Sequence, residues 1–172
     1  MEKLLLQQFQ VQVELQCEFL LAAAHDVNTG LAAKDVRHTF YALQNVLNAG
    51  ANISKALWGS GGKLADKRKP LRDSIGIEDC SPLRDVAMRN NFEHFDERLD
   101  RWWAESENHT WADLNIGNRA SFEVNAEIDS FRIFDPRTTD ITFWGERFNL
   151  QTLVIEVEKI LPKLQEELNT PR

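Results

Sequence analysis

The chain has 172 residues, of which 42% are hydrophobic and 27% are charged, and its formal net charge is −7. This length suits a single domain over residues 1–172, and the composition argues against disordered, fibrous and membrane-spanning classes. No apolar run approaches the roughly 20 residues that span a bilayer, and residues 1–8 lack the pattern of a secretion signal. We therefore expect a cytoplasmic protein without a membrane partner.

The acidic balance limits how this chain can bind nucleic acid, because phosphate binding depends on clustered lysine and arginine side chains. Any contact with RNA is therefore expected to be local. The two cysteines, Cys17 and Cys80, show no paired spacing and have no histidine partner nearby in the sequence. This argues against a zinc site and against a disulfide framework, so we expect reduced thiols, no metal and no cofactor.

Residues 1–28 mix Leu, Gln, Glu and Ala, which favour helices, although residues 9–19 alternate between apolar and polar side chains as a half-buried strand would. Both periods are available, and we favour the helix because Leu and Ala runs flank the alternating stretch. The helix would have two opposed apolar stripes, one of Leu6, Phe9, Val13, Cys17 and Leu20, the other of Leu4, Val11, Leu15, Phe19 and Ala22. The second stripe indicates a partner subunit, so we expect a homodimer.

The next segment is predicted to be a second helix over residues 31–58, after a turn at residues 28–30. Gly50 interrupts this helix and marks either close packing or a weak point. A loop is predicted from residue 59 to about residue 80, and it carries the basic cluster of the chain. Four of its side chains are candidate contacts to an RNA backbone, with a solvated loop as the favoured alternative: Lys63, Lys67, Arg68 and Lys69.

Residues 81–106 are predicted to form one helix. Ser81 and Pro82 fit an N-cap followed by proline at the first helical position. At about 100° per residue, a broad face expected to pack on the core collects Met88, Phe92, Phe95, Leu99, Trp102 and Trp103. On another flank Asn90 and His94 lie one turn apart, whereas Arg89 lies about 140° from His94 around the axis.

The segment after this helix carries strand signals. Residues 122–128 alternate between apolar and polar side chains, and residues 131–134 and 141–144 flank an Asp-Pro turn, so we expect a β-hairpin segment at about residues 121–146. Asn149 can cap a final helix, which Pro162 should kink or break. The predicted fold class is mainly α: an antiparallel helical bundle with a small β-hairpin inserted before the C-terminal helix.

The candidate chemistry lies in Arg89, Asn90 and His94. RNA carries its own nucleophile in the 2′-hydroxyl, so its cleavage needs a group that moves a proton near neutral pH and a cation that stabilises charge on the phosphate. His94 suits the first role and Arg89 the second, because a guanidinium stays charged and binds phosphate oxygens bidentately. Asn90 can orient the imidazole or hold a backbone oxygen. Because Arg89 and His94 diverge around one helix, a two-fold partner is needed to form one cleft.

An arginine followed by asparagine, with a histidine after four intervening residues, resembles the signature of the HEPN superfamily of small helical proteins. The resemblance covers about residues 1–103 and the last helix. It implies a helical bundle that dimerises so that the two motif helices meet in one composite site for metal-independent RNA cleavage. Many members are toxins of toxin–antitoxin or phage-defence systems, so an antitoxin is a further expected partner beside the RNA substrate.

Two features depart from the family or offer another interpretation. Some HEPN toxins carry a tyrosine two residues after the histidine that a partner nucleotidyltransferase modifies, and here that residue is Asp96. The charged residues around Arg89, among them Asp85 and Glu93, also suit an ordinary solvated helix face with ion pairs one turn apart. The competing hypothesis is therefore a non-catalytic helical interaction module, a dimeric protein- or nucleotide-binding domain.

Overall fold

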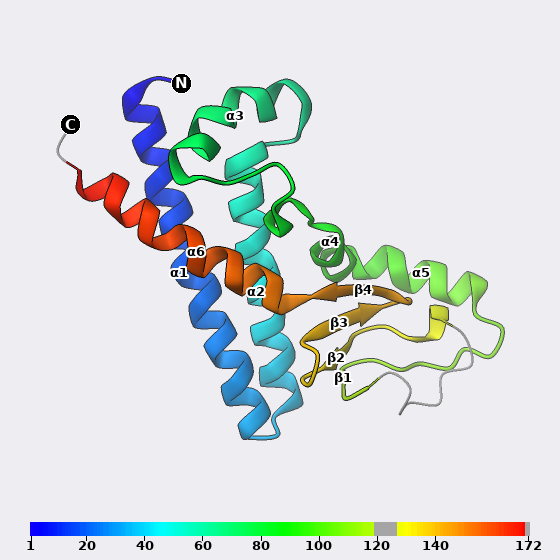
Figure 1. Ribbon diagram of the computed structural model, residues 1–172. Coiled ribbons are helices and arrows are strands. Elements are labelled where there is room, and N and C mark those ends of the chain that lie inside the picture. The colour runs from blue at the N-terminus through cyan, green and yellow to red at the C-terminus, as the bar shows by residue number, and fades with distance from the viewer. Residues whose placement is uncertain (119–126, 171–172) are drawn as a thin grey trace. The chain divides into compact units, whose positions relative to one another are not determined.

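The computed structural model describes residues 1–118 and 127–170 and shows a mainly helical chain with a small four-stranded sheet before the last helix (Figure 1). The mainly α fold class and the position of the β segment are therefore confirmed. The chain divides into two compact units. Unit 1 comprises Met1–His25, Asn45–Val86 and Thr152–Arg172, and unit 2 comprises Asp26–Gln44 and Ala87–Gln151. The prediction of a single domain stays a prediction.

Unit 1 is built from helices. Its elements are α1 (Lys3–Ala32), α2 (Val36–Trp58), α3 (Gly62–Ile75), the 3₁₀ turn η1 (Pro82–Arg84) and α6 (Leu150–Asn169), of which α1, α2 and α6 extend into unit 2 at one end. Fully buried side chains from these helices form its core: Val13, Cys17, Leu20, Ile53, Leu57, Leu71, Ile75, Val157, Ile160 and Leu164. Burial raises the pKa of the Cys17 thiol to about 12, because the charged thiolate is poorly solvated there.

Helix α1 confirms the helical interpretation of residues 9–19, but the predicted turn at residues 28–30 is wrong. Gly30 lies inside the helix because α2 approaches it closely: a Cβ atom at Gly30 would lie 2.7 Å from Oγ1 of Thr39. The chain reverses at residues 33–35 instead. There Asp35 Oδ1 accepts a hydrogen bond of 2.9 Å from the His38 backbone N–H, as a residue before a helix start does.

Gly50 of α2 marks close packing rather than a weak point. A Cβ atom there would lie 3.2 Å from Cδ1 of Leu153 on α6. The predicted break of α6 at Pro162 is wrong, since one helix continues through this residue to Asn169. A proline removes one backbone donor, and the buried apolar side chains on both sides of it offset that loss.

The predicted loop at residues 59–80 is also wrong over most of its length, because α3 occupies Gly62–Ile75. Helix α3 is short and amphipathic. It carries basic side chains on its exposed side and buries Leu71, Arg72 and Ile75. Arg72 Nη1 donates to the carbonyls of Leu57 and Ala65, each at 2.8 Å, which satisfies a charged group in the core. Gly76 then ends the helix with a φ of 68°, a left-handed conformation that glycine adopts without strain.

The predicted helix over residues 81–106 is interrupted twice. Ser81 does cap a helical turn, since its Oγ accepts from the Leu83 N–H at 3.4 Å, but that turn is η1 and the chain becomes extended at Asp85. Helix α4 (Ala87–Glu93) then forms, and α5 (Phe95–Glu105) begins after His94. The two helices also differ in burial: α4 buries Met88 and Phe92, whereas α5 has no buried residue and its Phe95 is 56% exposed.

Unit 2 contains the sheet, in which four strands lie side by side in the order β1 (Asn115–Ile116), β2 (Ile133–Asp135), β3 (Asp140–Phe143) and β4 (Glu146–Asn149) (Figure 1). Strand β1 runs parallel to β2, and the other neighbours are antiparallel. Strands β2 and β3 are the predicted hairpin. In the strand predicted at 122–128, residues 122–126 lie outside the described part of the chain, and Glu127–Asp129 form a 3₁₀ turn instead.

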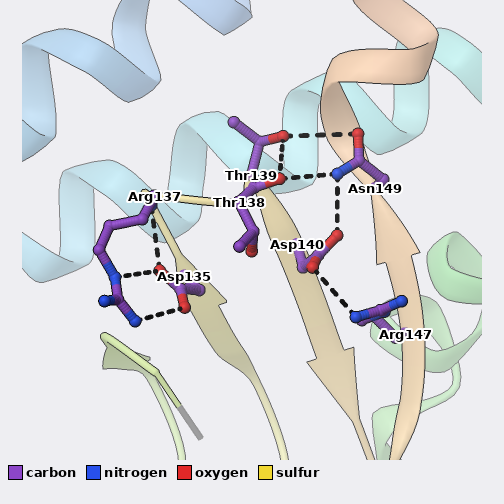
Figure 2. Close-up of polar contacts among 7 residues, drawn as sticks. All are labelled: Asp135, Arg137, Thr138, Thr139, Asp140, Arg147 and Asn149. Atoms are coloured by element: carbon purple, nitrogen blue, oxygen red, sulfur yellow. Dashed lines mark hydrogen bonds and ion pairs between the residues drawn. The ribbon is translucent and has the colours of Figure 1, made fainter.

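Polar contacts fix the end of this hairpin (Figure 2). Asp135 Oδ1 accepts from the Arg137 backbone N–H at 3.0 Å, and this bond holds the pKa of the Asp135 carboxyl below its usual value. The Asn149 amide donates to the Thr138 carbonyl at 2.7 Å and to Asp140 Oδ1 at 2.8 Å. Asn149, predicted as a helix cap, thus ties the end of β4 to the β2–β3 turn.

Candidate functional site

The three predicted site residues lie at the junction of α4 and α5 in unit 2. Arg89 and Asn90 belong to α4, and His94 is the residue between the two helices. The His94 N–H donates to the Asn90 carbonyl at 2.9 Å, and the Arg98 N–H donates to the His94 carbonyl at 3.2 Å. His94 therefore keeps the predicted spacing of one turn from Asn90, although its own backbone leaves the helical conformation.

Arg89 is held by its neighbours on α4. Its guanidinium forms an ion pair with Glu93, and Nη1 donates to Asn90 Oδ1 at 3.3 Å. Asn90 thus contacts the arginine rather than the imidazole. The sequence also allowed this ion pair, as one between residues one turn apart on an exposed helix face. The carboxylate of Glu93 partly neutralises the charge of Arg89. A phosphate would therefore have to compete with Glu93 for Nη1 of this guanidinium.

His94 carries a half-exposed imidazole, with 49% of the side chain accessible. Its Nδ1 lies 3.5 Å from Oε1 of Glu97, one turn into α5. Within residues 1–118 and 127–170, no hydrogen bond or ion pair joins His94 to the side chain of Arg89 or Asn90, and none engages its Nε2. The Glu97 carboxylate is shared, because its Oε2 also lies 3.5 Å from Arg98 Nη1.

The sequence interpretation missed Asn91, the residue that joins the elements around the site. This buried side chain donates from Nδ2 to Glu146 Oε2 on β4 at 2.8 Å and accepts from Arg98 Nε on α5 at 3.1 Å. The Arg98 guanidinium in turn lies 5.9 Å from the ring centroid of Trp144. A signal was present, because Asn91 follows Met88 by three residues and so borders the buried face of α4.

The aromatic face of α5 differs from its prediction. Phe95 and Trp103 are 56% and 68% exposed, whereas Met88 and Phe92 on α4 are buried as expected. Trp102 is half-buried, and its Nε1 donates to Asp129 Oδ1 at 3.1 Å. Asp129 is itself buried and accepts a second hydrogen bond of 2.5 Å from Ser106 Oγ. Trp102 is thus structural. Of the exposed pair, Phe95 directly follows His94, and the Trp103 ring lies 4.4 Å from the ring of His109, centroid to centroid.

The basic candidates Lys63, Lys67, Arg68 and Lys69 lie on α3 in unit 1 and not in a loop. Two of them have partners: Lys69 Nζ lies 2.6 Å from Asp73 Oδ1, and the Arg68 guanidinium lies 3.6 Å from the ring centroid of Phe9. Contact between this helix and an RNA backbone stays a prediction.

In residues 1–118 and 127–170, no three His, Cys, Asp or Glu side chains are grouped so that they could hold a metal ion. No helix in these ranges combines the length and the apolar character needed to cross a membrane. No protein-family model, curated protein or solved structure matches the chain.

Proposed function

We propose that this chain is a HEPN-like endoribonuclease that cleaves RNA without a metal ion, at a site to which two copies contribute Arg89 and His94. The observation that carries the proposal is His94 itself: a half-exposed imidazole, placed one turn after Asn90 and five residues after Arg89, with its Nδ1 3.5 Å from Oε1 of Glu97. A half-exposed imidazole with a carboxylate near one of its nitrogens suits general acid–base chemistry.

In the proposed reaction, Nε2 of one His94 accepts the proton of the ribose 2′-hydroxyl. The 2′-oxygen attacks the adjacent phosphorus, the bond from phosphorus to the 5′-oxygen breaks, and a 2′,3′-cyclic phosphate forms. The protonated His94 of the second copy gives its proton to the departing 5′-oxygen. Two imidazoles in opposite protonation states thus serve as base and acid, which is one chemical reason for two copies.

Arg89 is the proposed phosphate contact, because a guanidinium binds two phosphate oxygens and stabilises the charge that develops on them. In the free protein Glu93 occupies this guanidinium. Substrate binding would therefore exchange one anion for another, which lowers the affinity for RNA. Asn90 is a positioning residue in this proposal, since its Oδ1 contacts Arg89.

The exposed aromatic side chains beside His94 support the contribution of a second copy. Phe95 follows His94 directly, and Trp103 lies two turns further along α5. Apolar side chains that remain exposed next to polar functional groups are typical of surfaces that another molecule covers. A toxin role, with an antitoxin as protein partner and the cytoplasm as location, also belongs to this proposal.

The alternative function is a non-catalytic interaction module. The ion pair between Arg89 and Glu93 favours it, because such a pair one turn apart on a helix has a structural role that needs no substrate. In this case the charged residues of α4 and α5 would surround a protein- or nucleotide-binding surface, and loss of His94 would leave binding unchanged.

The test is incubation of purified protein with mixed RNA in the presence of EDTA. We expect cleavage that survives chelation, is lost in His94→Ala and Arg89→Ala, and persists in His25→Ala as a histidine control on α1. Glu93→Gln should cleave severalfold faster at low substrate, because the arginine is no longer paired with a carboxylate. Intact RNA with the parent protein, or equal cleavage by folded His94→Ala, would leave the non-catalytic module as the function.

A further inference from the structure

A cavity in unit 2 is lined partly by α5, the helix that follows His94. Its volume is about 310 Å³, which falls in the range of about 300–1,000 Å³ that ligand pockets usually have. Its described lining combines one cation, three carboxylates and two apolar side chains: Arg101, Glu105, Glu127, Ile128, Trp144 and Glu146. All six residues belong to unit 2, as does His94. The cavity is therefore formed within one part of the chain.

Trp144 lines this cavity from the two-residue turn between β3 and β4. Its φ of 50° is a left-handed conformation that bulky residues rarely adopt. Its indole Nε1 is enclosed and has no hydrogen-bond partner in the described part of the chain. Because Asn-Gly is the favoured pair in such a turn, the backbone does not explain a tryptophan before Gly145. The reason for this residue is therefore its ring and not the turn.

Two arginines of α5 lie over the Trp144 ring. The guanidinium carbon of Arg101 lies 5.1 Å from the ring centroid, and that of Arg98 lies 5.9 Å from it. Glu105 orients Arg101, since its Oε1 accepts from the arginine Nε at 2.9 Å. The Arg101 side chain is nevertheless 60% exposed, so it can turn toward a ligand. An indole beside a guanidinium is a surface on which proteins stack single-stranded bases.

Glu146 brings an oriented carboxylate to the same cavity. It lies on β4, and its Oε2 accepts from Nδ2 of the buried Asn91 at 2.8 Å. An ionised carboxylate only accepts hydrogen bonds, and it can accept from two donors at once. The cavity therefore offers acceptors in Glu146 and donors in Arg101, next to one aromatic ring.

We propose that this cavity is a subsite for a guanine base of RNA, stacked on Trp144. Guanine has two adjacent donors, N1–H and the N2 amino group, which the Glu146 carboxylate accepts together, and two acceptors, O6 and N7, which the Arg101 guanidinium reaches. Adenine, cytosine and uracil do not have two donor atoms side by side. A phosphate would meet three carboxylates in this cavity, and an organic cation would compete with two arginines for the ring.

The place of the cavity along α5 fits a base close to the cleaved bond. The inference rests on the proposed function here, since it takes RNA as the substrate. His94, Arg98, Arg101 and Glu105 follow one another at spacings of four, three and four residues, so they share one face of the helix. Arg101 lies about 10 Å beyond His94 along the axis. A base can therefore occupy the cavity while a nearby phosphate of the same strand lies at His94.

The first test measures binding apart from cleavage, with short 2′-O-methyl oligonucleotides that differ in one central base and cannot be cut. Calorimetry should show at least about tenfold tighter binding when that base is guanine, because a bidentate contact discriminates by about this factor. Equal affinity for all four bases would overturn the subsite. Binding of guanosine monophosphate without binding of any oligonucleotide would assign the cavity to a free nucleotide and would also overturn it.

Three variants examine which groups bind the base. Glu146→Gln keeps an oxygen for Asn91 but replaces the other acceptor by a donor, so it should lose most of the preference for guanine. Trp144→Asn suits the turn and removes the ring, so it should bind every oligonucleotide about tenfold more weakly. Asp100→Asn, an exposed control on α5 outside the cavity lining, removes the same charge as Glu146→Gln and should change neither value. A folded Glu146→Gln variant with the parental preference would overturn the assignment.

The second test maps the cleavage of mixed RNA in the same preparations. With the parent protein we expect cuts at a fixed position relative to guanine, and this preference should fall in Glu146→Gln. Guanine-selective binding without any cleavage would overturn the ribonuclease and leave the base subsite. Cleavage without any base preference would overturn the subsite and leave the ribonuclease.

Discussion

Helix α1 and the α4–α5 segment both carry apolar side chains at helical spacing, but they differ in how the chain uses them. In α1, one long helix buries one stripe and leaves the other in solvent. In α4–α5, the apolar side chains divide between a buried helix and an exposed one, and the backbone breaks at His94. Helical spacing therefore shows which side chains share a face, while the surrounding core decides which face is buried and where the helix ends.

This difference can be measured with two phenylalanines that the sequence pattern places on one face. Phe92→Ala should lower the free energy of unfolding by about 3–5 kcal/mol, because it empties a buried site beside the Phe143 ring, whose centroid lies 6.3 Å away. Phe95→Ala, an exposed position, should change it by less than about 0.5 kcal/mol. Denaturant titration of both variants measures the two effects, and equal losses would contradict the described burial.

Substitution of the two asparagines of α4 should also change the free energy of unfolding by different amounts, but the difference is smaller. Asn91→Ala should lower the free energy of unfolding by about 1–3 kcal/mol, because it removes the hydrogen bonds of a buried side chain to Glu146 Oε2 and Arg98 Nε. Asn90→Ala, at a half-buried position whose side chain accepts a hydrogen bond from Arg89, should cost less than about 1 kcal/mol but reduce cleavage more. Denaturation and RNA cleavage, measured on both variants, separate the structural residue from the positioning residue.

The smallest effect is expected at the hairpin turn, as a dependence of stability on pH. The pKa of Asp135 is lowered in the folded protein, chiefly by the Arg137 backbone N–H, so the charged carboxylate stabilises the fold. This contribution is present above the unfolded-state pKa and is lost as the pH falls through the lowered folded-state pKa. Asp135→Asn should therefore be less stable than the parent at neutral pH and should match it in strong acid.

Arg137→Ala is the control for this titration, because it keeps the backbone donor and removes only the side chain. It should retain most of the pH dependence that Asp135→Asn loses. Unfolding measured at a series of pH values distinguishes the two variants. A parent whose stability relative to Asp135→Asn does not change with pH would show that the turn carboxylate is not stabilised in its charged form.

The sequence predicted those elements of the fold that depend on interactions between residues close together in the chain. The helices α1 and α2 and the β2–β3 hairpin follow from spacing and turn residues alone. Helix α3 was missed because its helical signal lies in a few buried positions, and Arg72 is held by carbonyls that lie 15 and 7 residues away in the chain. The sequence predicts a turn at Gly30. The reason for this glycine is its close contact with Thr39, which is not adjacent in sequence and so is not visible in the local pattern.

The sequence predicted only part of the candidate site, as it predicted only part of the fold. The residue types and the one-turn spacing of Asn90 and His94 follow from the sequence, and the structure keeps that spacing. The ion pair between Arg89 and Glu93 is one that the helical spacing also allowed. The other partners do not follow from the sequence: Glu97 beside His94 and Glu146 on Asn91 depend on where α4 ends and which strand packs against it. A motif thus identifies the reacting groups, and the tertiary structure decides what holds them.

The burial of Cys17 has a practical consequence for physical studies of this protein. Its thiolate is disfavoured and its side chain is fully enclosed, whereas Cys80 is exposed, with Sγ 3.5 Å from Glu78 Oε2. A maleimide dye should therefore attach at one position of the unaltered folded chain. Energy transfer in a mixture of chains labelled at Cys80 with donor and acceptor dyes would then test whether the chains associate in solution, without any engineered residue.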